Sequence, residues 1–380
     1  MKAIKFNEPF ITGREIEYIQ DVFAQKRFYG AGKYTELCEE KIKSITGAKH
    51  ALLTDSCTAA LEITALLLRD FDKQQEVIVP SYTFSSTASA FARAGFKIIF
   101  CECDEQNMMM DVKDVQKKIT KNTVAIIPVH YGGLAANIRP ICDLAKKFNL
   151  VVVEDAAQGF NSSLDNQQIG TFGHFGCFSF HETKNIHCGL GGALLVNDEK
   201  YLNRARHIWE RGTNRQDVLK GLVDKYSWVE VGGSFYPSEL QSAFLFAQLE
   251  SLDDNLKKRK VIYEIYCNKL TKLKENNAFH FPFIDTNFNS NYHAFFIIFN
   301  SEFDADGVRE YLVAHDVHAY IGYVALHSSP VGIKMGYTPE SLPKTELLAK
   351  RVLRLPFHNN MSEQDTDRVT NLITEYFNAN

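Results

Sequence analysis

Short apolar runs that alternate with helical patterns constrain the fold of this chain more than any other feature. Runs such as "EVIVP" (76–80), "TVAIIPV" (123–129) and "LVVVED" (150–155) are apolar at successive positions, so both faces of each run are predicted to be buried. Helical patterns such as 138–148 separate them. Strands of this kind, separated by helices, are typical of a parallel sheet covered on both sides. The sequence therefore predicts an α/β fold.

The pattern changes near residue 275, where "YHAFFIIF" (292–299) and the helical patterns that follow it predict a smaller α+β unit. A chain of 380 residues is too long for one ordinary core. A long helical pattern that begins near "PSEL" (237–240) crosses the boundary between the two units. We therefore expect a large α/β domain over residues 1–250 and a small C-terminal α+β domain over residues 251–380.

The charge balance and the apolar runs exclude two classes of partner. The formal net charge is −4, from 42 basic and 46 acidic residues, and no basic block occurs, so nucleic-acid binding is not expected. The beginning of the chain, "MKAIKFNEPF", lacks an apolar signal core, and runs such as "AFFIIF" (294–299) are too short to span a bilayer. No membrane partner is expected, and the expected location is the cytoplasm.

The eight cysteines are scattered singly except for "CEC" at 101–103. No histidine lies near that pair, so its spacing does not indicate a metal site. We expect reduced, mostly buried thiols and no bound metal.

Three polar clusters follow predicted strands, at the sheet edge where ligands bind in parallel α/β folds. In the first, "TDSCTAA" (54–60), a strand gives way to a helix. Small residues let backbone N–H groups approach an anion, and the helix N-terminus adds partial positive charge, so a phosphate is the expected guest. The alternative is a plain helix cap by Ser56 or Thr58.

The other two clusters carry a carboxylate and an amine. "EDAAQG" (154–159) places Asp155 at the end of a buried strand, where a carboxylate needs a cation nearby, with Gln158 three residues further on. The alternative is that Asp155 caps the following turn. "SFHETKN" (179–185) offers one lysine, Lys184, between an aromatic-rich strand and a glycine cluster. The alternative is that Lys184 is an exposed, unreactive lysine in a loop.

Together, the three clusters supply what is needed to hold pyridoxal phosphate. The phosphate would lie at the helix N-terminus, Asp155 would keep the pyridine nitrogen protonated, and Lys184 would form the Schiff base. An aromatic residue to stack on the ring is available in "PSYTF" (80–84), where we favour Phe84 over Tyr82.

Several motifs resemble, in order, the sugar-nucleotide aminotransferases of the DegT/DnrJ/StrS family, which are fold-type I pyridoxal phosphate enzymes. These motifs are "SCTAALE", "EVIVPSYTFSST", "VEDAAQG", "GCFSFHETKN" and "GLGGALLVND", and the similarity runs along almost the whole chain. The resemblance implies a large, mostly parallel sheet of the seven-stranded type with a smaller C-terminal domain. "HETKN", "RGTNR", "VDKYSW" and "SELQSA" resemble most the branch of dTDP-4-amino-4,6-dideoxygalactose transaminases.

Carried over position by position, the resemblance implies Lys184 as the Schiff-base lysine, Asp155 at the pyridinium and Gln158 at the ring hydroxyl. It also implies contacts to the phosphate and the substrate: Cys57, Thr58 and Ser179 at the phosphate, with Cys57 acting through its backbone N–H, and Tyr323 and His327 near the substrate.

Two features bear on the subunit arrangement and the reaction type. Many family members bring an asparagine from the neighbouring subunit to the phosphate, but "GGSFYPSELQ" places Ser234 there with no arginine after it. We therefore expect a homodimer with the active site at its interface, and a weaker or different contact from Ser234. A related class with histidine in place of the lysine acts as dehydratases, so Lys184 favours amino transfer. His181 and His187, which flank it, are expected to be structural.

The reaction implied by the resemblance is ping-pong transfer of the amino group of L-glutamate to C4 of dTDP-4-keto-6-deoxy-D-glucose. The product, dTDP-4-amino-4,6-dideoxy-D-galactose, would enter the synthesis of a surface polysaccharide such as the lipopolysaccharide O-antigen. Alternatives that remain open are the gluco product, a 3-keto sugar and a UDP nucleotide. A regulatory protein that binds the cofactor without turning over a sugar is a more distant alternative.

Overall fold

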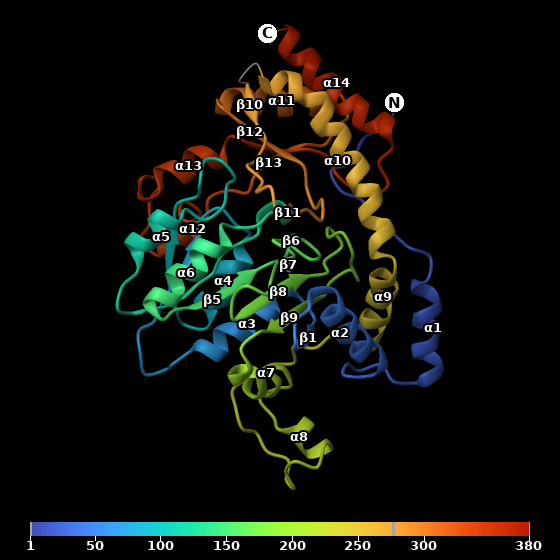
Figure 1. Ribbon diagram of the computed structural model, residues 1–380, viewed down its shortest axis with the longest axis vertical. Coiled ribbons are helices and arrows are strands. Elements are labelled where there is room, and N and C mark those ends of the chain that lie inside the picture. The colour runs from blue at the N-terminus through green and yellow to red at the C-terminus, as the bar shows by residue number, and fades with distance from the viewer. Residues whose placement is uncertain (1, 276–277, 380) are drawn as a thin grey trace.

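A seven-stranded sheet forms the centre of the computed structural model, which describes residues 2–275 and 278–379 (Figure 1). Its strands are β1 (Ala51–Thr54), β2 (Glu76–Pro80), β3 (Lys97–Cys101), β4 (Thr123–Ile126), β5 (Val151–Asp155), β8 (Phe175–Ser179) and β9 (Gly192–Val196). Their order is β1-β9-β8-β5-β4-β2-β3. Only β9 runs antiparallel to its two neighbours, and every other pair is parallel. The prediction of an α/β fold with a large, mostly parallel sheet is confirmed.

Helices cover both faces of this sheet, as the buried apolar strands require. They are α1 (Glu15–Gln25), α2 (Lys33–Thr46), α3 (Cys57–Leu68), α4 (Ser85–Arg93), α5 (Val112–Lys118), α6 (Ile138–Phe148), α7 (Leu202–Trp209) and α9 (Glu239–Glu250). Alternate residues of β2 show the two layers. Val77 and Val79 pack in the core shared with α3, α4 and α7, whereas Ile78 packs in the core shared with α5 and α6. The sheet is therefore buried on both sides.

A second, four-stranded sheet lies toward the C-terminal end of the chain (Figure 1). Its order is β10-β12-β14-β13, and three helices pack with it. These elements are β10 (Phe279–His280), β12 (Phe296–Phe299), β13 (Tyr320–Ile321), β14 (Val352–Arg354), α10 (Leu252–Glu275), α11 (Glu302–Ala314) and α14 (Glu363–Ala379). In β12, Ile297 and Phe299 face a core formed with these helices, whereas Phe296 and Ile298 pack against Tyr82 of the large domain. The small sheet thus closes over the large one.

The long helix expected from residue 237 onward is in fact two helices, because the backbone of Ser251 leaves the helical conformation between α9 and α10 (φ −99°, ψ 12°). The division into residues 1–250 and 251–380 stays a prediction. Ile4, from the beginning of the chain, packs in the core of the small domain, so that core draws on both ends of the sequence.

The remaining elements are short: strands β6 (Ser163–Leu164), β7 (Gln167–Gln168) and β11 (Phe288–Asn289), which form a small sheet; helices α8 (Arg215–Leu219), α12 (Pro330–Lys334) and α13 (Pro343–Ala349); and 3₁₀ turns at Tyr131–Gly133, Glu199–Tyr201 and Pro339–Ser341. Helix α8 projects from the body of the molecule, away from the small domain (Figure 1). Within the described residues, none of the helices combines the length and apolar character needed to cross a bilayer.

Candidate active site

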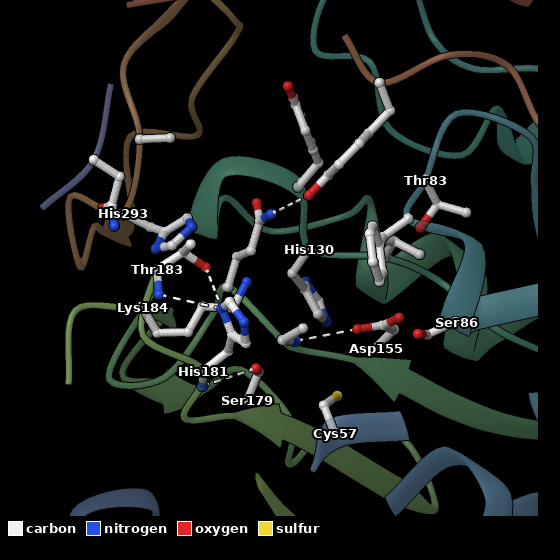
Figure 2. Close-up of a pocket in the computed structure, with 18 of the residues that line it drawn as sticks. Cys57, Thr83, Ser86, His130, Asp155, Ser179, His181, Thr183, Lys184 and His293 are labelled. Atoms are coloured by element: carbon white, nitrogen blue, oxygen red, sulfur yellow. Dashed lines mark hydrogen bonds between the residues drawn. The ribbon is translucent and has the colours of Figure 1, made fainter. Parts of the chain in front are cut away.

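A cavity of about 480 Å³ lies beside the carboxyl ends of β5 and β8 and the N-terminus of α3. Figure 2 shows Lys184 and Asp155 reaching into it from two sides, with Cys57 and Ser179 along its floor. Eight of the predicted site residues line it: Cys57, Thr58, Phe84, Asp155, Gln158, Ser179, Lys184 and Tyr323. The residues predicted at three separate strand ends therefore share one cavity.

The N-terminus of α3 forms one end of the cavity. Ser56 caps the helix, since its hydroxyl accepts the N–H of Ala59 at 3.1 Å. The N–H groups of Cys57 and Thr58 have no acceptor within the described part of the chain. The Thr58 hydroxyl donates to the hydroxyl of Ser86 at 2.9 Å, and both residues line the cavity. Two free N–H groups, two hydroxyls and the helix dipole form a site suited to a phosphate.

Ser179 adds a further hydroxyl to this end of the cavity. It is the last residue of β8 and pairs with Gly192 of the neighbouring strand. A Cβ atom on Gly192 would lie only 2.4 Å from the backbone nitrogen of Cys57, so the close approach of β9 to the start of α3 requires a glycine. This packing holds the end of β8 beside the helix N-terminus.

Asp155 is a buried carboxylate without a cationic hydrogen-bond partner. It is 5% exposed, and burial raises its pKa. Its Oδ2 accepts from the Thr87 hydroxyl at 2.7 Å and its Oδ1 accepts from the N–H of Ala157 at 3.1 Å, and both bonds lower the pKa. No Lys, Arg or His of the described residues forms an ion pair with it. A carboxylate held this way favours a cationic guest such as a pyridinium.

The neighbouring Glu154 is satisfied by the protein itself. Its carboxylate accepts N–H groups from Gly170 (2.9 Å), Phe172 (2.7 Å) and Gly173 (2.7 Å). It also bonds to Nε2 of His130 at 2.9 Å, and both side chains are fully buried. His130 accepts the Ala136 N–H at Nδ1, which makes Nε2 the donor to Glu154. Of the two adjacent acids, only Asp155 faces the cavity.

Lys184 provides the amine of the cavity. Its backbone N–H bonds to the carbonyl of His181 at 2.8 Å, which closes a tight turn after β8, and its Nζ has no hydrogen-bond partner among the described residues. Burial lowers its pKa to about 8. The positive charge of Arg354 also lowers this pKa, whereas Cys57 and Asp155 raise it. About a tenth of the amine is therefore unprotonated and nucleophilic at pH 7, far more than for an ordinary lysine.

Gln158 and Phe84 lie on the wall toward the small domain. Gln158 accepts the N–H of Gly132 at Oε1 (2.6 Å) and donates from Nε2 to the Tyr323 hydroxyl (3.1 Å), so its amide orientation is defined. The Phe84 ring is 58% exposed, and its centroid lies 6.0 Å from that of Tyr323. Tyr82 is 1% exposed and does not line the cavity, so Phe84 is the residue in a position to stack on a ring.

The structure places two predicted residues away from the cavity of their own chain. His327 is fully buried, its Nδ1 lies 2.7 Å from the hydroxyl of Ser81, and its Nε2 lies 3.3 Å from the carbonyl of Pro339. Packing therefore encloses this side chain, in contrast to the expected position near the substrate. Ser234 is exposed and pairs with Glu210 on the segment that carries α8. Its expected contact is with a partner subunit and stays a prediction.

The two flanking histidines differ in their surroundings. His187 bonds through Nε2 to the carbonyl of Phe10 at 3.0 Å, outside the cavity. His181 lines the cavity, and its Nδ1 lies 3.0 Å from the Thr183 hydroxyl. Burial lowers the pKa of both imidazoles.

The sequence interpretation missed residues that enter the cavity from distant segments. Phe6 and Asn7, from the beginning of the chain, line it together with His293 and Arg354 of the small domain. His293 is 7% exposed, its Nδ1 lies 3.0 Å from Oδ1 of Asn185, and burial lowers its pKa well below the ordinary value. No local pattern around these residues signals a site.

The donor set fits pyridoxal phosphate. The free N–H groups at the start of α3 with nearby hydroxyls suit its phosphate, the uncompensated carboxylate of Asp155 suits its ring nitrogen, and the amine of Lys184 suits its aldehyde.

The whole chain is similar to known aminotransferases. A sequence model of the DegT/DnrJ/EryC1/StrS aminotransferase family matches residues 9–374. The GDP-perosamine synthase of Escherichia coli O157:H7 is 27% identical over 383 residues, which cover 99% of both chains. A DegT DnrJ EryC1 StrS aminotransferase from Brucella abortus is 29% identical, with a TM-score of 0.84 over 96% of this chain and 95% of the other. DesV of S. venezuelae, solved with a ketimine intermediate, is 26% identical, with a TM-score of 0.88 over 99% of both chains.

Proposed function

Because the chain belongs to the DegT/DnrJ/EryC1/StrS aminotransferase family and is a pyridoxal phosphate-dependent sugar aminotransferase, we propose that it transfers the amino group of L-glutamate to C4 of dTDP-4-keto-6-deoxy-D-glucose. The product would be dTDP-4-amino-4,6-dideoxy-D-galactose, formed in the cytoplasm and used in the synthesis of a surface polysaccharide. The main evidence for amino transfer is that Lys184, Asp155 and the N-terminus of α3 line one cavity. The dTDP-sugar rests on the motifs around "HETKN" and "VDKYSW".

The cofactor, when bound, supplies an electron sink that stabilises negative charge on the carbon bearing the amine. Asp155 maintains that sink, because an ionised carboxylate beside the ring nitrogen keeps the nitrogen protonated. Thr87 and Ala157 hold the carboxylate in place through their hydrogen bonds. Ser179, Thr58 and the α3 N–H groups would fix the phosphate and so the position of the ring.

Lys184 has two tasks. As a nucleophile it would hold the cofactor through its aldehyde, and as a free amine it would move a proton to or from the substrate carbon. A general base works best when its pKa is near the working pH, and the pKa of about 8 for Lys184 meets that condition. Without a hydrogen-bond partner for its Nζ among the described residues, the amine is free to swing between these tasks.

Capture of pyridoxal phosphate by the apoenzyme is expected to accelerate with pH up to about 8 and then level off. With a pKa of about 8, the neutral fraction of Lys184 rises from about 0.1 at pH 7 to about 0.5 at pH 8 and about 0.9 at pH 9. The rate should therefore rise about fivefold over the first interval and less than about twofold over the second. Stopped-flow measurement of Schiff-base absorbance checks this. A rate that still rises about tenfold between pH 8 and pH 9 would indicate an ordinary lysine, with a pKa of about 10.4.

The segment around α8 supports the proposal of a homodimer. It exposes large apolar side chains: Leu219 (66%), Leu222 (71%), Tyr226 (58%) and Trp228 (76%). An apolar patch on a projecting arm is typical of a protein interface. We infer that this arm, with Ser234, reaches the active site of the partner subunit.

Sedimentation velocity is expected to show a dimer, and the double substitution Leu222→Asp with Trp228→Asp is expected to give monomers with little activity, because two charges would be buried in the interface. Phe303→Asp, at an equally exposed site on α11 (80% exposed), is the matched control and should leave the dimer intact. A fully active monomer would rule out the shared site.

Incubation of the holoenzyme with L-glutamate and the dTDP-4-keto sugar, followed by NMR of the product, tests the proposed reaction. The expected product has an axial amino group at C4. An equatorial group would assign the gluco product. No product from the 4-keto sugar, together with amination of a dTDP-3-keto sugar supplied in a separate incubation, would assign a 3-keto substrate. A GDP-linked sugar is the second candidate, because a relative over the full length is a GDP-perosamine synthase. Turnover of GDP or UDP sugars with none of the dTDP sugar would refute the proposed nucleotide.

A further inference from the structure

His293 lies on the wall of the active-site cavity, in the segment just before β12. Its backbone is held by Arg259, which is almost fully buried. The guanidinium donates from one terminal nitrogen to the carbonyl of His293 at 2.6 Å and from Nε to the carbonyl of Tyr292 at 2.8 Å. Figure 2 shows His293 on the same side of the cavity as Thr183 and Lys184. The imidazole is therefore held in place beside the reactive amine.

A buried asparagine fixes the tautomer of His293. Asn185, the residue after Lys184, donates from its Nδ2 to the carbonyl of Asn291 at 2.6 Å. Its Oδ1 is therefore the atom that lies 3.0 Å from Nδ1 of His293. Because an amide oxygen only accepts hydrogen bonds, Nδ1 must carry the hydrogen. A neutral imidazole of this tautomer has a bare lone pair at Nε2.

Nε2 is the nitrogen of His293 that is available to a ligand. It forms no hydrogen bond within the described residues, and it is open to the cavity, whereas both nitrogens of His358 are buried without a partner. Burial lowers the pKa of His293 well below the ordinary value, and the positive charges of Lys184, Arg259 and Arg354 act in the same direction. The imidazole therefore stays neutral at physiological pH and keeps its lone pair.

We propose that Nε2 of His293 accepts a hydrogen bond from a ring hydroxyl of the keto sugar and so helps to orient the sugar in the cavity. This rests on the proposed function, in which a 4-keto-6-deoxyhexose enters the cavity with free hydroxyls at C2 and C3. A lone pair needs a hydrogen-bond donor, and an ionised carboxylate, a phosphate or a keto oxygen supplies none. Asn185 is a positioning residue in this account, because it acts through the imidazole.

The amine of the amino donor is the competing hydrogen-bond donor. As an ammonium it would add a positive charge next to His293, where Lys184, Arg259 and Arg354 already place three. Repulsion between like charges disfavours such a guest, whereas a neutral hydroxyl meets no repulsion. Ordered water is the other occupant that a bare lone pair accepts. Experiments that vary the sugar separate these three ligands.

Kinetics of the return half-reaction test the proposal, with wild type, His293→Asn and His293→Gln compared. Each apoenzyme is loaded with pyridoxamine phosphate and mixed with the keto sugar, and the rising Schiff-base absorbance gives a saturation constant and a limiting rate. The asparagine amide can still donate to Asn185 but does not reach the position of Nε2. The saturation constant of His293→Asn is therefore expected to rise about 10-fold, with a smaller change in the limiting rate. The longer glutamine can place its amide oxygen near that position and should recover part of the loss.

Sugar nucleotides that lack the hydroxyl at C2 or at C3 identify the group that His293 contacts. In wild type, removal of the contacted hydroxyl should raise the saturation constant about 10-fold. In His293→Asn the same removal should have little further effect, because its partner is already absent.

Two controls separate this role from general damage. His318→Asn, at an exposed histidine that does not line the cavity, should behave as wild type does. In the half-reaction with L-glutamate, His293→Asn should keep a saturation constant within about twofold of wild type. Nitrogen-15 NMR of wild-type apoenzyme with labelled histidines reports the tautomer without any reaction, and the hydrogen of His293 is expected on Nδ1.

Four results would overturn the proposal: an unchanged constant for the keto sugar in His293→Asn, an equal loss for L-glutamate, full additivity of the substitution with both hydroxyl removals, or a hydrogen on Nε2. Full additivity would assign the lone pair to water. A wild-type enzyme that reacts only with a GDP- or UDP-linked sugar would instead correct the nucleotide of the proposed function. The same comparison of variants with that sugar would still decide the role of His293.

Discussion

Replacing Lys184 by alanine is expected to lower turnover by at least about 10⁴-fold and to abolish the visible absorbance of the Schiff base. The variant loses both the nucleophile and the general acid–base, and acid–base catalysis alone typically contributes about 10²- to 10⁴-fold. Steady-state assays with the keto sugar and absorbance spectra of the purified holoprotein measure the two effects.

Lys146→Ala is the control for this experiment, because Lys146 is an exposed lysine on α6. It should retain both the activity and the chromophore. A Lys184→Ala enzyme that turns over at the wild-type rate would refute the role assigned to Lys184. Partial restoration of turnover by added primary amines would support that role.

Replacing Asp155 by asparagine is expected to lower turnover by about 100- to 1,000-fold while the protein still binds some cofactor, because the ring nitrogen loses its counter-charge. The size of the amide is close to that of the carboxylate. Its oxygen can still accept the Ala157 N–H while its NH2 group donates to the Thr87 hydroxyl. Single-turnover kinetics with L-glutamate measure the loss. Unchanged kinetics would mean that another group protonates the ring.

The same substitution should not destabilise the apoenzyme. Burial raises the pKa of Asp155, so the folded apoprotein holds its proton more tightly than the unfolded chain does. The stability that this group contributes is complete below the ordinary pKa of about 3.9 and is lost as pH rises through the raised value. At neutral pH the ionised carboxylate therefore costs stability, and apo Asp155→Asn should melt at the same temperature as wild type or higher.

With pyridoxal phosphate added, wild type should melt at a higher temperature than Asp155→Asn, because the cofactor stabilises wild type more than the variant. Asp143→Asn, an exposed acid on α6, should shift neither melting temperature. An apo Asp155→Asn protein that melts well below wild type would show that the carboxylate has a structural role.

Lys184, Asp155 and the start of α3 could be predicted from the sequence because each follows a strand whose apolar residues mark it as buried. Parallel strands bring their carboxyl ends to one edge, so three clusters separated by many residues could be expected to meet. Glycines 189, 191 and 192 after the lysine gave a further local signal. The antiparallel direction of β9 and the break at Ser251 carry no such signal, since both depend on packing between elements.

The contributions of distant segments could not be predicted in this way. Arg354 and Arg351 lie three residues apart in the same strand region, and only the arrangement of the two sheets places one of them on the cavity. The same holds for Phe6 and His293. For His327 the local motif suggested a position near the substrate, but packing against Ser81 and Pro339 encloses the side chain. A sequence motif places a residue along the chain, whereas exposure depends on tertiary packing.

Reduction of the holoenzyme with borohydride, followed by proteolysis and mass spectrometry of the peptides, tests the central claim most directly. The reagent makes the Schiff base permanent, so the modified lysine can be read from the peptide that carries the pyridoxyl group. The expected result is a single modified site at Lys184. A pyridoxyl group on any other lysine, or on none, would contradict the assignment of this cavity.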